Sequence, residues 1–104
     1  MNETRIFRAL ADPRRREIFE KLAQGQMNAS ALRTGMTISQ PAMSQHLSVL
    51  REAGLVLEER NGRFVNYKVN PQGLAQIMGW LTKYSAYWPE RIESLKDLLK
   101  DMDQ

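Results

Sequence analysis

The sequence of 104 residues contains no cysteine and only one histidine. The lack of cysteine excludes disulfide bonds, thiolate metal ligands and thiol-based redox sensing. One histidine is too few for a metal site built from imidazoles. No apolar run reaches the roughly 18 residues that span a bilayer, and the N-terminal residues form no apolar signal segment. We therefore expect no cofactor, no metal, no membrane partner and a cytoplasmic protein.

A catalytic constellation is also lacking. No nucleophile–base pair accompanies His46, so we expect no enzymatic activity. The length fits a single domain over residues 1–104 with one modest core. The net charge of +3 is uneven: residues 1–70 hold eleven Lys and Arg against seven Asp and Glu, whereas residues 71–104 hold four against five. This distribution predicts that the first part faces a polyanion and the second faces a partner chain.

One predicted helix, over residues 38–54, has two chemically different faces. One face carries Met43, Leu47 and Leu50 at helical spacing and is expected to be buried. The other face carries short hydroxyl and amide side chains, namely Gln40, Ser44, Gln45 and Ser48. Amides and hydroxyls both donate and accept hydrogen bonds, so this face suits base edges in the major groove of double-stranded DNA.

Three shorter helices are expected before it, at residues 3–11, 13–24 and 29–34. Asp12, Asn28 and Ser39 are suitable N-caps for the second, third and fourth helices. The third helix, a turn containing Gly35 and the fourth helix form a helix-turn-helix over residues 28–54. The first helix carries Ile6, Phe7 and Leu10 on one side. The second is expected to point Ile18, Leu22 and Ala23 inward.

The next segment, residues 55–69, alternates between apolar and polar residues as a β-hairpin does. Residues 60–63 are expected to form the turn, because Asn-Gly is a strong hairpin signal. A hairpin directly after a helix-turn-helix is a wing. Arg60 and Arg63 flank its tip, where they suit contacts with a phosphate backbone or a minor groove. The alternative is a solvated hairpin end, where arginine is common.

The last segment, residues 71–104, carries an apolar stripe at helical spacing. Asn70 and Pro71 mark its start, and Pro89 predicts a kink or a break. The stripe is too long for so small a domain to cover, so we expect burial against a second copy, together with residues 1–11. The residues expected at this homodimer interface are Phe7, Leu74, Ile77, Leu81, Tyr84, Trp88, Ile92 and Leu95.

Four segments of the chain, with the sequences ALADPRRR, SQPAMSQHLSVL, EAGLV and RNGR, resemble the arsenical-repressor (ArsR-type) winged-helix transcriptional regulators. The resemblance implies a mainly α fold with a small β-hairpin wing, a winged helix-turn-helix that dimerises through its first and last helices. It also implies repression at a palindromic operator, often the protein's own promoter. On the matching positions it implies DNA contacts from Ser39, Gln40, Ser44, Gln45, His46, Arg60 and Arg63.

The chain departs from the metal-sensing members of that family. These members place cysteines in the third helix, where this chain has Ala29, Ser30 and Ala31, or ligands including histidine in the last helix, which has none here. The resemblance is therefore to a branch without metal-site cysteines or histidines, and metal sensing is not supported.

Several residues keep two interpretations. The arginines at 14–16 suit phosphate contacts, but ion pairs with Glu17, Glu20 or other acids are the simpler explanation. His46 is either a hydrogen-bonded structural residue or a DNA contact, and Arg51 is either a phosphate clamp or a surface charge.

An aromatic cluster in the last helix also has two explanations, interface packing or a pocket for an unknown organic inducer. Its members are Trp80, Tyr84, Tyr87 and Trp88. A third function class, a winged-helix module for protein interaction, would have apolar residues on the exposed helix face and no arginine at the wing tip.

Overall fold

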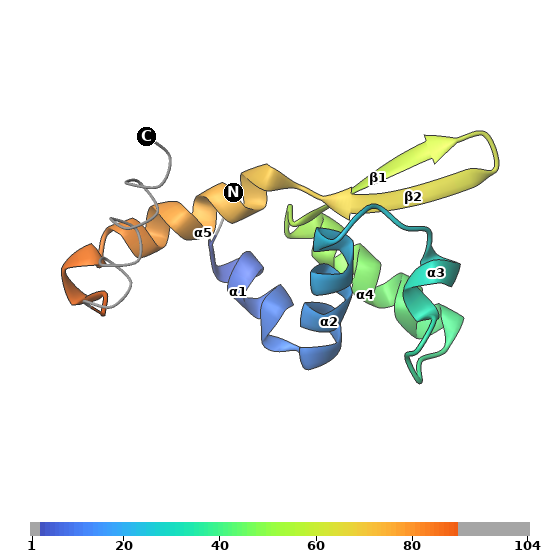
Figure 1. Ribbon diagram of the computed structural model, residues 1–104, viewed down its shortest axis with the longest axis horizontal. Coiled ribbons are helices and arrows are strands. Elements are labelled where there is room, and N and C mark those ends of the chain that lie inside the picture. The colour runs from blue at the N-terminus through green and yellow to red at the C-terminus, as the bar shows by residue number, and fades with distance from the viewer. Residues whose placement is uncertain (1–2, 90–104) are drawn as a thin grey trace, which may run out of the picture.

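The computed structural model describes residues 3–89 as a helical body with a projecting β-hairpin (Figure 1). Its elements in chain order are α1 (Glu3–Ala11), α2 (Pro13–Ala23), α3 (Ala29–Arg33), α4 (Gln40–Glu52), β1 (Val56–Asn61), β2 (Phe64–Val69), α5 (Pro71–Thr82) and the 3₁₀ helix η1 (Ser85–Tyr87). The hairpin and the far end of α5 extend from opposite sides of the body. The two helices α3 and α4 are followed directly by the hairpin, so the mainly α winged helix-turn-helix fold is confirmed.

Four helices begin at the predicted N-caps. The side chains of Asp12, Asn28, Ser39 and Asn70 each accept a hydrogen bond from a backbone N–H in the first turn of the following helix. For α4, the Ser39 hydroxyl oxygen lies 3.2 Å from the backbone nitrogen of Ala42. Such caps satisfy N–H groups that have no partner within the helix, and each is worth about 0.5–2 kcal/mol. The start of α4 is therefore determined by neighbouring residues.

The core lies where α1, α2, α3 and α4 meet the base of the hairpin. Its fully buried side chains include Ile6, Ile18, Leu32, Met43 and Leu50. The predicted buried face of α4 is thereby confirmed. One inward prediction was wrong, because Ala23 at the end of α2 is exposed.

The hairpin turn differs from the prediction by one residue. Asn61 pairs with Phe64, so the loop consists of Gly62 and Arg63 alone. Gly62 has a φ of 62° and Arg63 has a negative φ, which is the combination of a type II′ turn. Glycine fits the first loop position because that position requires a positive φ. As a consequence β1 includes Arg60, and Arg63 stands at the tip.

The last helix is shorter than the apolar stripe predicted. α5 ends at Thr82, seven residues before Pro89, and η1 follows. A proline ring clashes with the carbonyl four residues earlier and excludes helical angles at the residue before it. Trp88 accordingly has extended angles, with φ −67° and ψ 143°. Pro89 thus excludes helical angles at Trp88, whereas α5 has already ended at Thr82. The rest of the stripe, from residue 90, lies outside the described residues.

The arginines of α2 bind backbone carbonyls, which neither sequence interpretation anticipated. Arg15 Nε donates to Ala9 O at 2.7 Å and Arg16 Nη1 donates to Leu10 O at 2.9 Å, at the C-terminal end of α1. Cations are favourable there because the last helical carbonyls lack partners. Arg15 also lies 3.9 Å from Asp12, the one acid with which these arginines pair within residues 3–89. Ion pairs with Glu17 or Glu20 are therefore not formed in this range.

Candidate nucleic-acid interface

The exposed face of α4 carries the side chains that the sequence predicted for it. Gln40, Ser44 and Gln45 are exposed, and Ser48 is half-buried, whereas Met43 and Leu47 on the opposite face are buried. Amide groups present both a donor and an acceptor, and hydroxyls can act as either. A helix with one side fixed in the core and such groups on the other is able to form hydrogen bonds with base edges.

The turn before α4 is held by hydrogen bonds from arginines. Arg14 Nη1 donates to Thr37 O at 2.9 Å, and Arg33 Nε donates to Ile38 O at 3.2 Å. Gly35 has a φ of 82°, a backbone conformation that glycine adopts without strain. Ser39 caps the helix as predicted and remains exposed. These contacts fix where the first turn of α4 begins.

His46 is placed on the flank of α4 rather than on its exposed face. The imidazole is half-buried, and its Nδ1 atom is buried without a hydrogen-bond partner within residues 3–89. Asp12 lies close enough for His46 to influence its titration. Partial burial raises the pKa of Asp12, but hydrogen bonds from the N–H groups of Arg15 and Arg14 outweigh this and lower the pKa. His46 is half-buried, as Ser48 is, and lies beside the exposed polar side chains of α4 rather than among them.

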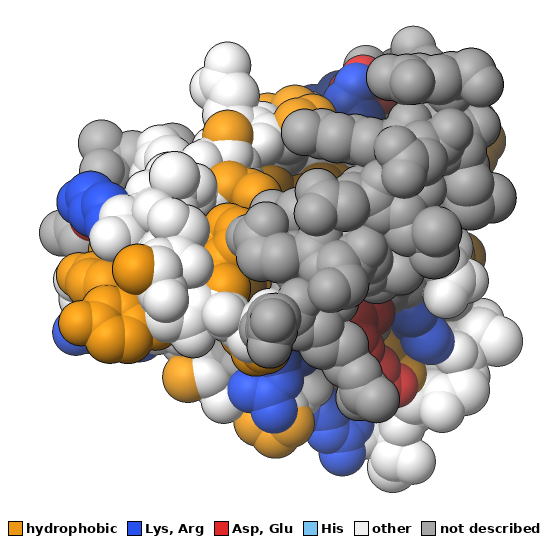
Figure 2. Space-filling model, turned by 60° about the vertical axis from the view of Figure 1, so that its left-hand side comes forward, with side chains coloured by type: hydrophobic (Ala, Val, Ile, Leu, Met, Phe, Trp, Pro, Cys, Tyr) orange, Lys and Arg blue, Asp and Glu red, His pale blue; other side chains and the backbone are white. Residues whose placement is uncertain are grey.

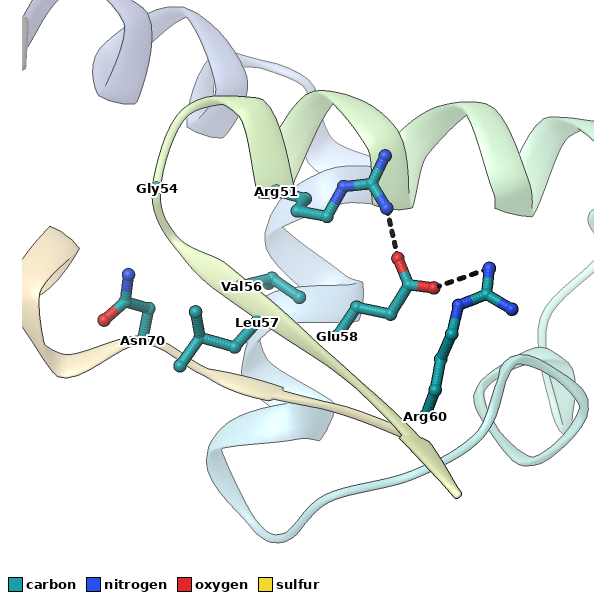
Figure 3. Close-up of a pocket in the computed structure, with 7 residues that line it drawn as sticks. All are labelled: Arg51, Gly54, Val56, Leu57, Glu58, Arg60 and Asn70. Atoms are coloured by element: carbon teal, nitrogen blue, oxygen red, sulfur yellow. Dashed lines mark hydrogen bonds and ion pairs between the residues drawn. The ribbon is translucent and has the colours of Figure 1, made fainter. Parts of the chain in front are cut away.

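The wing supplies two arginines, and their surroundings differ. Arg63 is exposed at the turn and has no hydrogen bond or ion pair to any of residues 3–89. Arg60 lies on the same face of β1 as Glu58, and its Nη2 is 3.2 Å from a carboxylate oxygen of Glu58. The same carboxylate binds Arg51 through its other oxygen (Figure 3). Within residues 3–89, Arg63 at the tip is thus an unpaired cation, whereas Arg60 belongs to a cluster with Glu58 and Arg51.

This cluster joins the end of α4 to the wing, and the sequence did not predict it. The alternation along β1 could have placed Glu58 and Arg60 on one face, since they are two residues apart. The contact of Glu58 with Arg51 depends on how the strand returns past the helix, which no local pattern shows. The hollow beside the cluster measures about 630 Å³.

A second exposed surface lies on α1 and α5. Phe7, Leu74, Leu81 and Tyr84 are exposed, and Figure 2 shows apolar side chains at the surface of this end of the molecule. The ring of Trp80 lies 5.1 Å from that of Phe7 and 4.9 Å from that of Tyr84, measured between centroids. These contacts attach α5 to α1 and leave the apolar groups beside them in solvent.

The other predicted interface residues are distributed differently. Ile77 is half-buried and packs against the core, so it belongs partly to the fold itself. Trp88 is half-buried beyond α5. Tyr87, predicted to lie in the aromatic cluster, is 85% exposed in η1. Ile92 and Leu95 lie outside the described residues.

Within residues 3–89, no three His, Cys, Asp or Glu side chains gather as metal ligands would. No described helix combines the length and the apolar character needed to cross a bilayer.

Comparison with known proteins shows that the chain is similar to bacterial transcriptional regulators. The sequence profile described as "Bacterial regulatory protein, arsR family" matches residues 12–57. The transcriptional repressor SdpR of Bacillus subtilis is 33% identical over 79 residues, which cover 76% of this chain and 88% of that protein. The HTH-type transcriptional regulator Rv2034 of Mycobacterium tuberculosis is 36% identical over 95 residues, covering 91% and 86%.

A solved structure is also similar. The homodimeric winged helix-turn-helix DNA-binding domain of Mb0332 from Mycobacterium bovis, described as a possible ArsR-family regulator, aligns with a TM-score of 0.65. The two chains are 28% identical, and the alignment covers 80% of this chain and 77% of that one.

Proposed function

Because the chain belongs to the arsR family of bacterial regulatory proteins, we propose that it is a repressor that binds a palindromic operator as a homodimer. The observation that carries this proposal is the exposed polar face of α4 beside a wing whose tip holds Arg63, which is unpaired within residues 3–89. A dimer places two such helices in successive major grooves on one side of the duplex.

Recognition of bases is assigned to the amide and hydroxyl groups of α4. Gln40 and Gln45 each suit a bidentate pair with adenine, and Ser44 lies between them. Ser48 and the capping Ser39 border the same face. Arg60 and Arg63 contribute affinity by neutralising phosphates, which carries no sequence information. His46 is a contact with the backbone at most, since it lies on the flank of the helix.

Dimerisation is assigned to the apolar surface of α1 and α5. An isolated domain with Phe7, Leu74, Leu81 and Tyr84 in solvent exposes apolar area that a second copy would cover. The relative Mb0332 is described as homodimeric, and a two-fold dimer requires the same patch on both copies. Helical spacing places Leu74 and Leu81 on one side of α5.

We propose further that repression requires no metal and that the protein acts on its own promoter. The chain has no cysteine and one histidine, so a thiolate or poly-imidazole site is not available. Repression of a reporter placed behind the gene's own upstream DNA tests autoregulation. Addition of a chelator should leave that repression unchanged.

The recognition role is tested on the duplex that the protein selects from random DNA. Gln45→Ala should weaken binding to it by about 1–3 kcal/mol and relax the base preference at one position of each half-site. Gln26→Ala is the matched control, because Gln26 is an exposed glutamine in the loop between α2 and α3. Equal affinity of the Gln45→Ala and Gln26→Ala proteins would remove Gln45 from the recognition surface.

The dimer is tested by analytical ultracentrifugation. Leu81→Glu should shift the protein from dimer to monomer, because it places a charge in the proposed apolar interface. Leu57→Glu is the control, since Leu57 is similarly exposed, at 40% against 37%, but lies on the wing. If both variants sediment as the unaltered protein does, α5 is not the interface.

The alternative function, a winged-helix module for protein interaction, predicts that selection from random DNA yields no enriched duplex at all.

A further inference from the structure

Arg51, Glu58 and Arg60 form a charged cluster between the end of α4 and the wing (Figure 3). One carboxylate oxygen of Glu58 binds Arg51 Nη1, and the other lies 3.2 Å from Arg60 Nη2. The Glu58 side chain is only 12% exposed, whereas those of Arg51 and Arg60 are 47% and 74% exposed. The acid is therefore enclosed between two guanidinium groups that remain accessible.

The cluster keeps unused hydrogen-bond donors and a positive charge. Each guanidinium has five N–H donors, and Glu58 engages one nitrogen of each. Two arginines and one glutamate leave a net charge of about +1 by simple counting of ionised groups. The groups border a groove of about 630 Å³, with Gly54 and Asn70 among its other lining residues. Its chemistry fits an anion with several oxygens.

The groove lies between the two proposed DNA-contacting elements. Arg51 is three and seven residues from Ser48 and Ser44, so helical spacing places it along the same side of α4. Arg60 is three residues from the tip residue Arg63 and shares a face of β1 with Glu58, with which it pairs. The groove is therefore placed to meet the phosphate backbone of a duplex that α4 and the wing contact together.

We propose that Arg51 and Arg60 bind phosphodiester groups of the DNA backbone, and that Glu58 is a positioning residue that aims both arginines and ties the wing to α4. This inference rests on the proposed DNA-binding function and adds a site to it. An acid beside a polyanion reduces the attraction. Glu58 therefore lowers the affinity for any DNA and favours the one docked geometry in which both arginines reach phosphates.

The phosphate contacts are tested by the salt dependence of binding. Anisotropy titrations with the selected duplex and with a scrambled duplex, at several salt concentrations, give the slope of log K against log salt. Arg51→Gln and Arg60→Gln should each reduce that slope by about 1 per protomer on the selected duplex. Lys68→Gln is the control, because Lys68 pairs with Glu59 at 2.5 Å in the same hairpin and not with Glu58. Its slope should equal that of the unaltered protein.

The positioning role of Glu58 is tested by specificity. Glu58→Gln should strengthen binding to the scrambled duplex, since a negative charge is lost, and should reduce the ratio of selected to scrambled affinity by about 3–10-fold. Glu59→Gln removes the same charge from the neighbouring residue, which pairs with Lys68. It should change the affinities for the selected and the scrambled duplex alike, so that their ratio is preserved. Circular dichroism melting curves check that every variant is folded.

The outcomes separate this inference from the function on which it rests. Unchanged salt slopes in both arginine variants, with normal binding by the unaltered protein, overturn the phosphate site and leave the DNA-binding function intact. Equal ratios for Glu58→Gln and Glu59→Gln overturn the positioning role. If the unaltered protein binds no duplex at low salt, the proposed function and the phosphate site both fall.

Discussion

Gly73 is the position where a single methyl group should disturb the relation of α5 to the rest of the fold. It lies in the first turn of α5 and is buried against the junction of α4 and β1. A Cβ atom there would be 2.5 Å from the backbone oxygen of Gly54 and 3.1 Å from a methyl group of Leu55. A backbone carbonyl cannot rotate away as a side chain can, so α5 must shift.

The expected cost of Gly73→Ala follows from two opposing effects. Overpacking a tight contact costs about 1–3 kcal/mol, and alanine recovers at most about 1 kcal/mol of helix propensity. We expect a net loss of about 1–2 kcal/mol, measured by urea denaturation at fixed protein concentration. Gly79→Ala is the control, since no atom of residues 3–89 lies within 4 Å of its added Cβ, and should stabilise by up to about 1 kcal/mol. Equal stability of the two variants would refute the packing argument.

Three further predictions concern the core, a cap and the wing tip. Leu50→Ala should destabilise the fold by about 2–5 kcal/mol, because Leu50 is fully buried in α4, and denaturation midpoints would report it. Asp12→Asn should keep the cap of α2 but abolish a pH dependence: a lowered carboxyl pKa gives stability that is present above about pH 4 and is lost as pH falls through the lowered value. Melting curves between about pH 2 and 7, which includes the range in which carboxyl groups titrate, would show this pH dependence in the unaltered protein and its loss in the variant. Arg63→Ala should weaken all duplexes alike and flatten the salt slope by about 1, whereas a loss confined to the selected duplex would assign Arg63 to base recognition.

Features set by a few neighbouring residues could be predicted from the sequence. Each cap needs only an Asp, Asn or Ser before an apolar-periodic segment, and all four proposed caps form as expected. The buried face of α4 follows from the spacing of Met43, Leu47 and Leu50, and the spacing also places the amides outward. The polar outer face of α4 could thus be predicted from residues within the helix itself.

Features that depend on distant segments could not be predicted. Arg14, Arg15 and Arg16 meet carbonyls of α1 and of the turn before α4, which only the packed fold brings near. The same holds for Arg51 and Glu58, which approach one another because β1 folds back along α4.

Two errors arose from competition between local signals. The Asn-Gly pair predicted a turn centred on itself, but glycine at the first loop position of a type II′ turn satisfies the same hairpin one residue later. The apolar stripe predicted helix as far as Pro89, but α5 ends at Thr82 and residues 85–87 form a 3₁₀ segment. The carbonyl that the ring of Pro89 opposes is that of Ser85, four residues earlier.

The central claim, that a dimer recognises a DNA sequence with two copies of α4, is tested most directly by selection of bound duplexes from random DNA at physiological salt. The account predicts an enriched palindrome whose half-sites are centred about 10–10.5 base pairs apart or a multiple of this. Adenines should recur where Gln40 and Gln45 reach. Weak enrichment without a shared sequence, lost when salt is added, would contradict the claim and leave only attraction to phosphates.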